Sequence, residues 1–294
     1  MEAVWTVILL NGIYWASVLF LMSLGLNIIL GVGGILNLTH GELFAFGAYM
    51  AAWSILALVN LVPPPLIFLS IVAGLAMAAF VGLIVEVLFI RPMYKRTLEY
   101  QLLMTFGLLL VFEDVIKLIW GGEAYYASQP MVLLGHTYVA GYLYPVYFLF
   151  VIAASLVAGG VVWHVMFKTK TGVMLRAVAM DKEMSSAIGL SVKKLSTIAF
   201  VFGAALAGFG GALMAPVIPV LLGIGLEPLL LAFMVIVIGG LGSLKGALVG
   251  SLVIGIVRSI GVAIIPEIEL AVTFLIAAII LAVRPEGLFG GRRR

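Results

Sequence analysis

Long apolar runs recur along almost the whole chain, and they constrain its fold more than any other feature. Each run is close to the roughly 20 residues that an α-helix needs to cross the hydrocarbon core of a bilayer. The runs cover residues 5–30, 43–62, 65–90, 98–120, 143–167, 195–218, 228–244, 246–265 and 268–284. We therefore predict an all-α polytopic integral membrane protein with about eight or nine transmembrane segments, some of them broken by glycine or re-entrant.

The composition agrees with this prediction. Hydrophobic residues make up 64% of the 294 positions, charged residues make up 10%, and the mean hydropathy is +1.29. A water-soluble domain cannot bury that much apolar surface. The runs leave no space for a separate soluble domain, so we expect residues 1–294 to form one transmembrane domain. Glu2 is the only early charge and no basic segment precedes the first run, so this run is expected to be a spanning helix rather than a cleavable signal peptide.

Lysine and arginine residues cluster at three places, which predicts the orientation, because such residues concentrate in cytoplasmic loops. The connection over residues 121–142 contains neither and is expected to face the outside. Counting crossings then puts the N-terminus outside and the C-terminus in the cytoplasm, in a cell inner or plasma membrane. The three clusters are Arg91, Lys95 and Arg96; Lys168, Lys170, Arg176, Lys182, Lys193 and Lys194; and Arg284, Arg292, Arg293 and Arg294.

One long polar segment, Thr171–Gly189, lies inside the second basic cluster. It carries Arg176, Asp181, Lys182 and Glu183 among small residues. With its flanks it forms the largest predicted cytoplasmic loop, at residues 168–194. A membrane protein that keeps such an insert in water is expected to contact a soluble partner through it. The alternative is a solvated loop whose charges only set the orientation.

Two glycine-rich breaks interrupt the apolar pattern, at residues 31–49 and 238–250. Paired interruptions of this kind in a transporter indicate an internal repeat whose broken helices line the transport path. Polar residues in the breaks are the candidates for that path: Asn37, His40, Glu42 and Ser243. Counted along the chain, His40 and Glu42 fall near the cytoplasmic end, where they would brace the fold or a gate instead. The alternative is two ordinary tight loops.

Other polar groups lie within the predicted spans, where they are costly. Glu86 and Arg258 are near span ends, so we expect them to pair with another charge or to extend toward the membrane surface.

The sequence disfavours an enzyme. It contains no GxxxxGK[ST] phosphate loop, so ATP hydrolysis by that route is excluded. The three histidines fall on separate segments without metal-ligand spacing, and the absence of cysteine excludes thiol chemistry and cysteine-ligated metals. We expect no cofactor and no metal. Transport remains as the predicted function.

Five segments in order carry a family resemblance: GLNIILGVGGILNLTHGELFAFGAYMA (25–51), LLMTFGLLLVFEDVIKLIWG (102–121), FVFGAALAGFGGALMAP (200–216), AFMVIVIGGLGSLKGALVGSLVIG (232–255) and VRPEGLFG (283–290). With these segments the chain resembles the LivH-type permease subunits of branched-chain amino acid ABC importers. Permeases for urea, short amides and sugars share parts of the pattern.

The resemblance implies a division of labour. A soluble binding protein delivers the substrate, this chain pairs with a second permease subunit (LivM-like, or a second copy), and two ATPase subunits in the cytoplasm drive transport. Nucleic acid is not an expected partner, and the C-terminal arginines are placed to contact anionic lipid headgroups. The polar insert becomes a docking helix over residues 172–189. Its expected coupling residues are Gly172, Arg176, Ala177, Asp181 and Gly189.

The expected cargo is a branched-chain or other hydrophobic amino acid, and the expected path is mostly apolar and weakly selective. Urea, short amides or sugars are alternative solutes on the same architecture. A different class, a channel or secondary carrier that needs no ATPase, would not require the polar insert.

Overall fold

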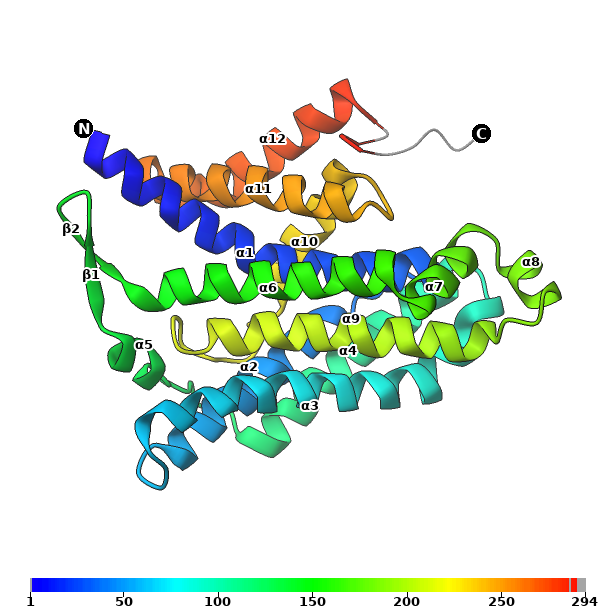
Figure 1. Cartoon of the computed structure of the whole chain (residues 1–294), viewed down its shortest axis with the longest axis horizontal. Helices are drawn as coiled ribbons and strands as arrows, with labels where there is room; N and C mark the ends of the chain where they lie inside the picture. Colours follow the sequence, from blue (N-terminus) through cyan, green and yellow to red (C-terminus); the bar gives the residue numbers. More distant parts are fainter. Residues whose placement is uncertain (1, 286, 290–294) are drawn as a thin grey trace.

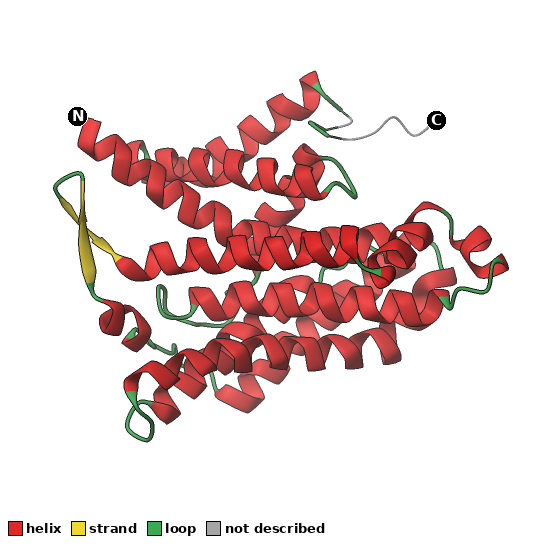
Figure 2. Cartoon of the chain, viewed as in Figure 1, coloured by secondary structure: helices red, strands yellow, loops and turns green. Residues whose placement is uncertain are grey.

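The computed structural model describes residues 2–285 and 287–289 as a bundle of long helices with one small hairpin (Figures 1 and 2). The first half contains α1 (Glu2–Gly33), α2 (His40–Leu58), η1 (Pro64–Phe68), α3 (Leu69–Val85), η2 (Glu86–Ile90), η3 (Arg91–Lys95), α4 (Leu98–Trp120) and α5 (Gln129–Leu134). The hairpin β1 (His136–Val139) and β2 (Tyr142–Pro145) follows. The second half contains α6 (Val146–Lys168), α7 (Lys170–Met180), α8 (Lys182–Ala187), α9 (Val192–Met214), α10 (Leu226–Gly239), α11 (Leu244–Ile264), η4 (Pro266–Ile268) and α12 (Glu269–Val283). Arg292, Arg293 and Arg294 lie outside the described residues.

The predicted all-α membrane fold is confirmed. Within the described ranges, 7 helical segments are long and apolar enough to cross a membrane. Every predicted apolar run contains a helix, but two of these helices, α4 and α10, are not among the 7 segments that could cross a membrane. Helix α4 carries Glu113, Asp114 and Lys117 near its end, and α10 has only 14 residues. The exact number of crossings therefore stays a prediction.

Helix α1 forms the centre of the bundle. Its spanning window is 89% buried, whereas that of α12 is 11% buried. It packs along α9, α10, α11 and α6. At the crossing with α9, Gly25 and Gly203 put the two backbones in direct contact. A Cβ atom on Gly25 would lie 2.4 Å from the Gly203 carbonyl oxygen, so only glycine fits there. Small residues allow this close approach in a bilayer, where packing drives helix association.

The first glycine-rich break folds back into the bundle. After Gly34, whose φ is +68°, residues 35–39 turn and α2 begins beside the middle of α1. The ring nitrogen Nε2 of His40 lies 3.1 Å from the carbonyl oxygen of Met22, 11 residues before the end of α1. The expectation that His40 and Glu42 fall near the cytoplasmic end is therefore wrong. Position along the chain misplaced them because the break returns toward the centre instead of ending outside the bundle.

The second break is the turn at residues 240–243 between α10 and α11. The Asn27 side chain of α1 holds it from both sides. Its Oδ1 accepts from the Gly242 backbone N–H at 2.7 Å, and its Nδ2 donates to the Ser243 carbonyl at 2.9 Å. This buried amide explains why a polar residue is placed within the first span, since backbone groups in a turn inside a membrane protein need internal partners.

The two ends of the bundle differ clearly. Helices α7 and α8 lie at one end, which we call the insert end, and the hairpin and α5 lie at the other, the hairpin end (Figure 1). The N-terminus is at the hairpin end and the C-terminal end of α12 points toward the insert end (Figure 1). The predicted cytoplasmic and outer connections are therefore on opposite ends, as the lysine and arginine pattern requires.

Candidate functional site

The polar insert is two short helices rather than the single helix expected over residues 172–189. Thr169 caps α7, its Oγ1 accepting from the Gly172 N–H at 3.1 Å. Asp181 then leaves the helical conformation, with φ −154° and ψ 108°. Its carboxylate accepts from the Met184 N–H at 2.9 Å and caps α8. Aspartate is a preferred N-cap residue, which is why the helix divides at this position.

The small residues of the insert serve its own folding. A Cβ atom on Gly172 would lie 2.1 Å from the Val165 carbonyl oxygen, so α7 folds tightly against the end of α6. Gly189 has φ +88° and ends the turn after α8, in the left-handed region that glycine tolerates. Ala177 is half-buried, and its carbonyl accepts from the Asp181 N–H at 3.0 Å. Their expected contact with an ATPase stays a prediction.

Arg176 points back toward the bundle. The centre of its guanidinium lies 4.9 Å from the centroid of the Phe167 ring. Its Nε atom is buried and has no hydrogen-bond partner among the described residues. Arg176 therefore belongs to the insert and also lines the cavity described below.

Four large apolar side chains are exposed on the insert, and the sequence analysis did not predict them. Val173 of α7 is 54% exposed, and the other three lie around α8. Met180 is 88% exposed, Met184 is 61% exposed and Ile188 is 67% exposed. We call these three the exposed apolar tip. Met180 is the last residue of α7, Met184 lies on α8, and Ile188 directly follows α8, its N–H donating to the Met184 carbonyl at 3.1 Å. Their spacing of four residues within a polar segment is the sequence signal that could have predicted them.

A chain of contacts connects α8 to the bundle. The Lys182 ammonium donates to the Gly33 carbonyl at 2.6 Å, at the end of α1, and lies 5.6 Å from the centroid of the Tyr94 ring. The Tyr94 hydroxyl donates to Glu86 at 3.3 Å. Burial lowers the pKa of Lys182. We call this the Lys182–Tyr94–Glu86 contact chain.

Glu86 is the last residue of the Lys182–Tyr94–Glu86 contact chain, and both of its carboxylate oxygens accept hydrogen bonds. It is buried at the start of η2, a π-helical turn that continues α3. Its Oε2 accepts from Arg91 at 2.9 Å and from the Thr197 hydroxyl at 2.8 Å. Since Thr197 belongs to α9, these contacts join α8 to α1, to η2 at the end of α3, and to α9. The expected pairing of Glu86 is confirmed.

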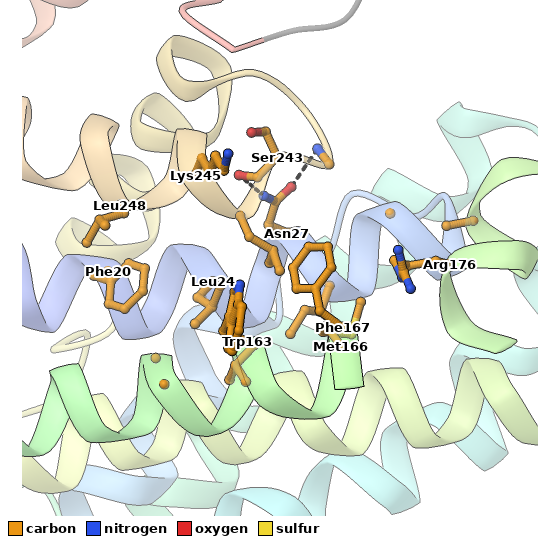
Figure 3. Close-up of a pocket in the computed structure, with 18 of the residues that line it drawn as sticks. Phe20, Leu24, Asn27, Trp163, Met166, Phe167, Arg176, Ser243, Lys245 and Leu248 are labelled. Atoms are coloured by element: carbon orange, nitrogen blue, oxygen red, sulfur yellow. Dashed lines mark hydrogen bonds between the residues drawn. The ribbon is translucent and has the colours of Figure 1, made fainter. Parts of the chain in front are cut away.

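A cavity of about 780 Å³ lies between α1, α6, α7 and the turn that joins α10 to α11. We call it the inner cavity (Figure 3). Its wall is mainly apolar and aromatic, with Phe20, Leu24, Trp163, Met166 and Phe167. Asn27 and Ser243 form a polar edge. Three cationic residues line it as well: Lys168, Arg176 and Lys245.

The four expected path residues are not brought together. Ser243 lines the inner cavity, although its hydroxyl caps α11 by accepting from the Gly246 N–H at 3.0 Å. Asn37 and His40 are fully buried and Glu42 nearly so, and none of these three lines the inner cavity. Asn37 accepts from the Thr39 N–H at 3.1 Å, within the break.

The start of α2 meets the start of α10. A Cβ atom on Gly41 would lie 2.8 Å from the Gly225 carbonyl oxygen, so the two helix beginnings touch through their backbones. Next to this junction, Asn37 bonds within the break and His40 contacts the Met22 carbonyl of α1. Among the described residues, no group of three histidine, aspartate or glutamate side chains is placed to hold a metal ion.

Comparison with known proteins decides the family. The family described as branched-chain amino acid transport system / permease component matches residues 8–283. The chain belongs to this family. The resemblance to LivH-type permeases is thereby confirmed, and so is the prediction of a multi-pass transport protein.

Individual relatives cover nearly the whole chain. The high-affinity branched-chain amino acid transport system permease protein BraD of Pseudomonas aeruginosa is 26% identical over 298 residues, covering 96% of this chain and 94% of BraD. The permease protein LivH of Escherichia coli K12 is 26% identical over 297 residues, covering 95% and 94%. A probable LivH of Methanocaldococcus jannaschii is 26% identical over 265 residues, covering 86% and 80%. No solved structure matches the chain.

Proposed function

We propose that this chain is a permease subunit of an ABC importer that moves branched-chain or other hydrophobic amino acids inward, with ATP hydrolysed by separate subunits. The single observation that carries the proposal is the insert of α7 and α8, which presents the exposed apolar tip outside the bundle and is bonded to α1 by Lys182. Membership of the permease family supports it.

The exposed apolar tip is suited to a protein partner. Burying one such side chain contributes about 1.5–3 kcal/mol, so leaving three of them in water is unfavourable unless a partner covers them. Asp181 and Glu183 flank the tip with negative charge at the start of α8. An apolar centre with a polar rim is the usual composition of a protein interface. We infer that the ATPase subunits cover this tip.

The contact chain gives a route for coupling. Lys182 bonds α8 to the last residue of α1, directly before the first break. A rigid-body movement of α8 would therefore displace the break and the start of α2, while Tyr94 and Glu86 carry the same movement to α3 and α9. Switching transitions commonly use such displacement of packed elements.

The two ends have different partners in this proposal. The insert end faces the cytoplasm, because Arg91, Lys168 and Lys170 lie there, and the C-terminal end of α12 points to the same side. The hairpin end, with the N-terminus, faces outside, where a soluble binding protein docks. A second permease subunit, LivM-like or another copy of this chain, completes the path in the inner or plasma membrane.

The inner cavity supports a hydrophobic cargo. Its aromatic and aliphatic wall suits an aliphatic side chain, whereas urea or a sugar requires hydrogen-bonding groups on most sides. Asn27 uses both of its polar atoms on the turn at 240–243, so it has little capacity left for a polar solute. We therefore infer weak selection by side-chain hydrophobicity in this cavity.

The test is affinity purification from native membranes followed by reconstitution. The proposal expects an ATPase and a second permease to co-purify, and expects the reconstituted complex to take up leucine only with ATP and a binding protein. A chain that purifies alone and transports without ATP would be a channel or secondary carrier instead.

A further inference from the structure

Arg258 of α11 forms a buried charge cluster at the hairpin end of the bundle. Its side chain is only 9% exposed. One of its terminal nitrogens contacts the Glu227 carboxylate at the start of α10, and its Nε lies 3.5 Å from the Glu269 carboxylate at the start of α12. The centre of the guanidinium stacks 3.8 Å from the centroid of the Trp15 ring. The expected pairing of Arg258 is confirmed, and it joins four helices.

The cluster has hydrogen-bonding capacity left over. The Nη1 atom of Arg258 is buried and has neither a hydrogen bond nor an ion pair among the described residues. Two carboxylates share this one guanidinium group. A buried guanidinium is costly unless its donors are used. An ion pair that served packing alone would be expected to use this donor.

A pocket of about 360 Å³ lies beside the cluster, and we call it the outer pocket. Arg258 and Glu227 both line it, and Glu227 is 45% exposed. The remaining lining is mostly apolar: Trp15, Met214, Ile218, Pro219, Leu221, Gly223, Ile224 and Pro228. One cation, one accessible anion and an aliphatic wall thus meet in one concave site.

The position of the outer pocket fits the start of the path. Its lining loop, residues 215–225, is bonded to the connection predicted to face outside, because Tyr125 and Val220 exchange two backbone hydrogen bonds of 2.9 Å each. Trp15 lies in the first half of α1, whereas Asn27 at the inner cavity lies in the second half. The two sites are therefore separated along the bundle.

We propose that the outer pocket binds the zwitterionic headgroup of an α-amino acid, an assignment that rests on the proposed transport function. The substrate carboxylate accepts from the free Nη1 of Arg258, and its ammonium group donates to the Glu227 carboxylate. Its aliphatic side chain packs against Met214, Ile218 and Ile224. Glu269 continues to neutralise Arg258 when Glu227 turns to the substrate.

This site selects the headgroup rather than the side chain. Urea and sugars carry no charges that match both Arg258 and Glu227, so they gain nothing from the pair. Any aliphatic side chain of suitable size fits the apolar wall, in agreement with weak side-chain selection in the inner cavity. The permease would then distinguish amino acids from neutral solutes even without its binding protein.

The test uses the complex purified with its ATPase subunits, in nanodiscs and without binding protein. Saturation-transfer NMR measures binding of L-leucine, of leucinamide, which lacks the carboxylate, and of 4-methylpentanoate, which lacks the ammonium group. We expect leucine to bind at millimolar concentration and each analogue to bind about tenfold more weakly or worse. Equal binding of all three, or stronger binding of urea, overturns the proposal.

Variants distinguish binding from packing. Arg258→Gln and Glu227→Gln are each expected to weaken leucine binding about tenfold. Glu227→Gln keeps the pair of Arg258 with Glu269, so this variant remains informative if Arg258→Gln does not fold. Lys117→Gln, which removes an exposed cation from α4, is the control and leaves binding unchanged. Unchanged leucine binding in Glu227→Gln would make the cluster a structural ion pair only.

Failure of this inference is distinct from failure of the proposed function. If ATPases co-purify and ATP-dependent leucine uptake is present while both variants bind leucine normally, the outer pocket assignment is wrong and the transport function stands. If the complex transports no amino acid with its binding protein, the proposed function fails and the assignment fails with it.

Discussion

The two buried charge clusters of this protein, one around Glu86 and one around Arg258, differ in how completely they are bonded. Glu86 accepts hydrogen bonds from Arg91, Tyr94 and Thr197, and its carboxylate oxygens are all used. Arg258 meets two carboxylates and an aromatic ring but keeps an unused donor beside a pocket. A closed cluster holds helices together, whereas an open one has capacity to bind a solute.

The surroundings reinforce this difference. The Glu86 cluster is connected through Tyr94 and Lys182 to α8, which carries part of the exposed apolar tip. The Arg258 cluster faces the outer pocket. We infer that the insert end drives transport and the hairpin end recognises the solute. The following predictions test that division, from the largest expected effect to the smallest.

Met184→Glu should show the largest difference between the functions of the two ends, because it should lower coupling and leave leucine binding unchanged. A carboxylate in the centre of an apolar interface costs enough to lower transport-coupled ATP hydrolysis by at least about tenfold. Leucine binding at the outer pocket should be unchanged. The measurements are ATPase activity of the reconstituted complex and NMR binding. Met184→Leu, which keeps an apolar side chain at the same position, serves as control, and retained coupling in Met184→Glu would exclude the tip from the interface.

Arg176→Glu should have a smaller effect of the same kind. The substitution removes the stacking on Phe167 while membrane insertion stays intact. Because this contact is worth about 1 kcal/mol, we expect coupled ATP hydrolysis to fall by about fivefold. Arg176→Lys should retain more activity because it keeps the charge. Unchanged coupling in Arg176→Glu would contradict a role of α7 in transmission.

Glu86→Gln and Glu227→Gln compare the two clusters by stability. Glu86→Gln replaces one of the two accepting carboxylate oxygens with an NH2 donor that faces other donors, and we expect the melting temperature to fall by about 5 °C. Glu227 is half-exposed and Arg258 keeps Glu269, so the corresponding fall should be about 1 °C. Thermal unfolding of the purified complexes measures both. A larger fall in Glu227→Gln would reverse the assignment of closed and open clusters.

The pH dependence of Lys182 gives the smallest effect. Burial lowers its pKa in the folded protein below the ordinary value of 10.5. Between these two values the unfolded chain binds more protons than the folded chain, so stability rises with pH in that window. At lower pH the cost of burying the charged ammonium is fully present.

Lys182→Met should abolish that rise. Comparing the melting temperatures of both proteins between about pH 8 and pH 10.5, we expect a difference of about 1 °C or less, because the side chain is only partly buried. Identical pH profiles would mean that the ammonium of Lys182 is hydrated and does not hold α8 to α1.

The helices could be predicted, and several site features could not. Length and hydropathy alone predicted a helix in each of nine runs. In a bilayer, an apolar run of this length can satisfy its own backbone hydrogen bonds only as a helix. The division of the insert at Asp181 was missed because a capping aspartate resembles any other charged loop residue until its backbone angles are known. His40 was misplaced because nothing local shows that residues 35–39 turn back toward Met22.

The sequence by itself determined the membrane class, the apolar helices, the distribution of lysine and arginine and the absence of a phosphate-loop motif, since these follow from composition and local patterning. Only the tertiary structure decided that Arg258, Glu227 and Trp15 meet around one pocket and that Lys182 reaches the end of α1. These residues are tens to hundreds of positions apart, and their contacts depend on how the helices pack. A polar residue within an apolar run looks the same in the sequence whether all of its hydrogen-bonding atoms have partners or one donor has none.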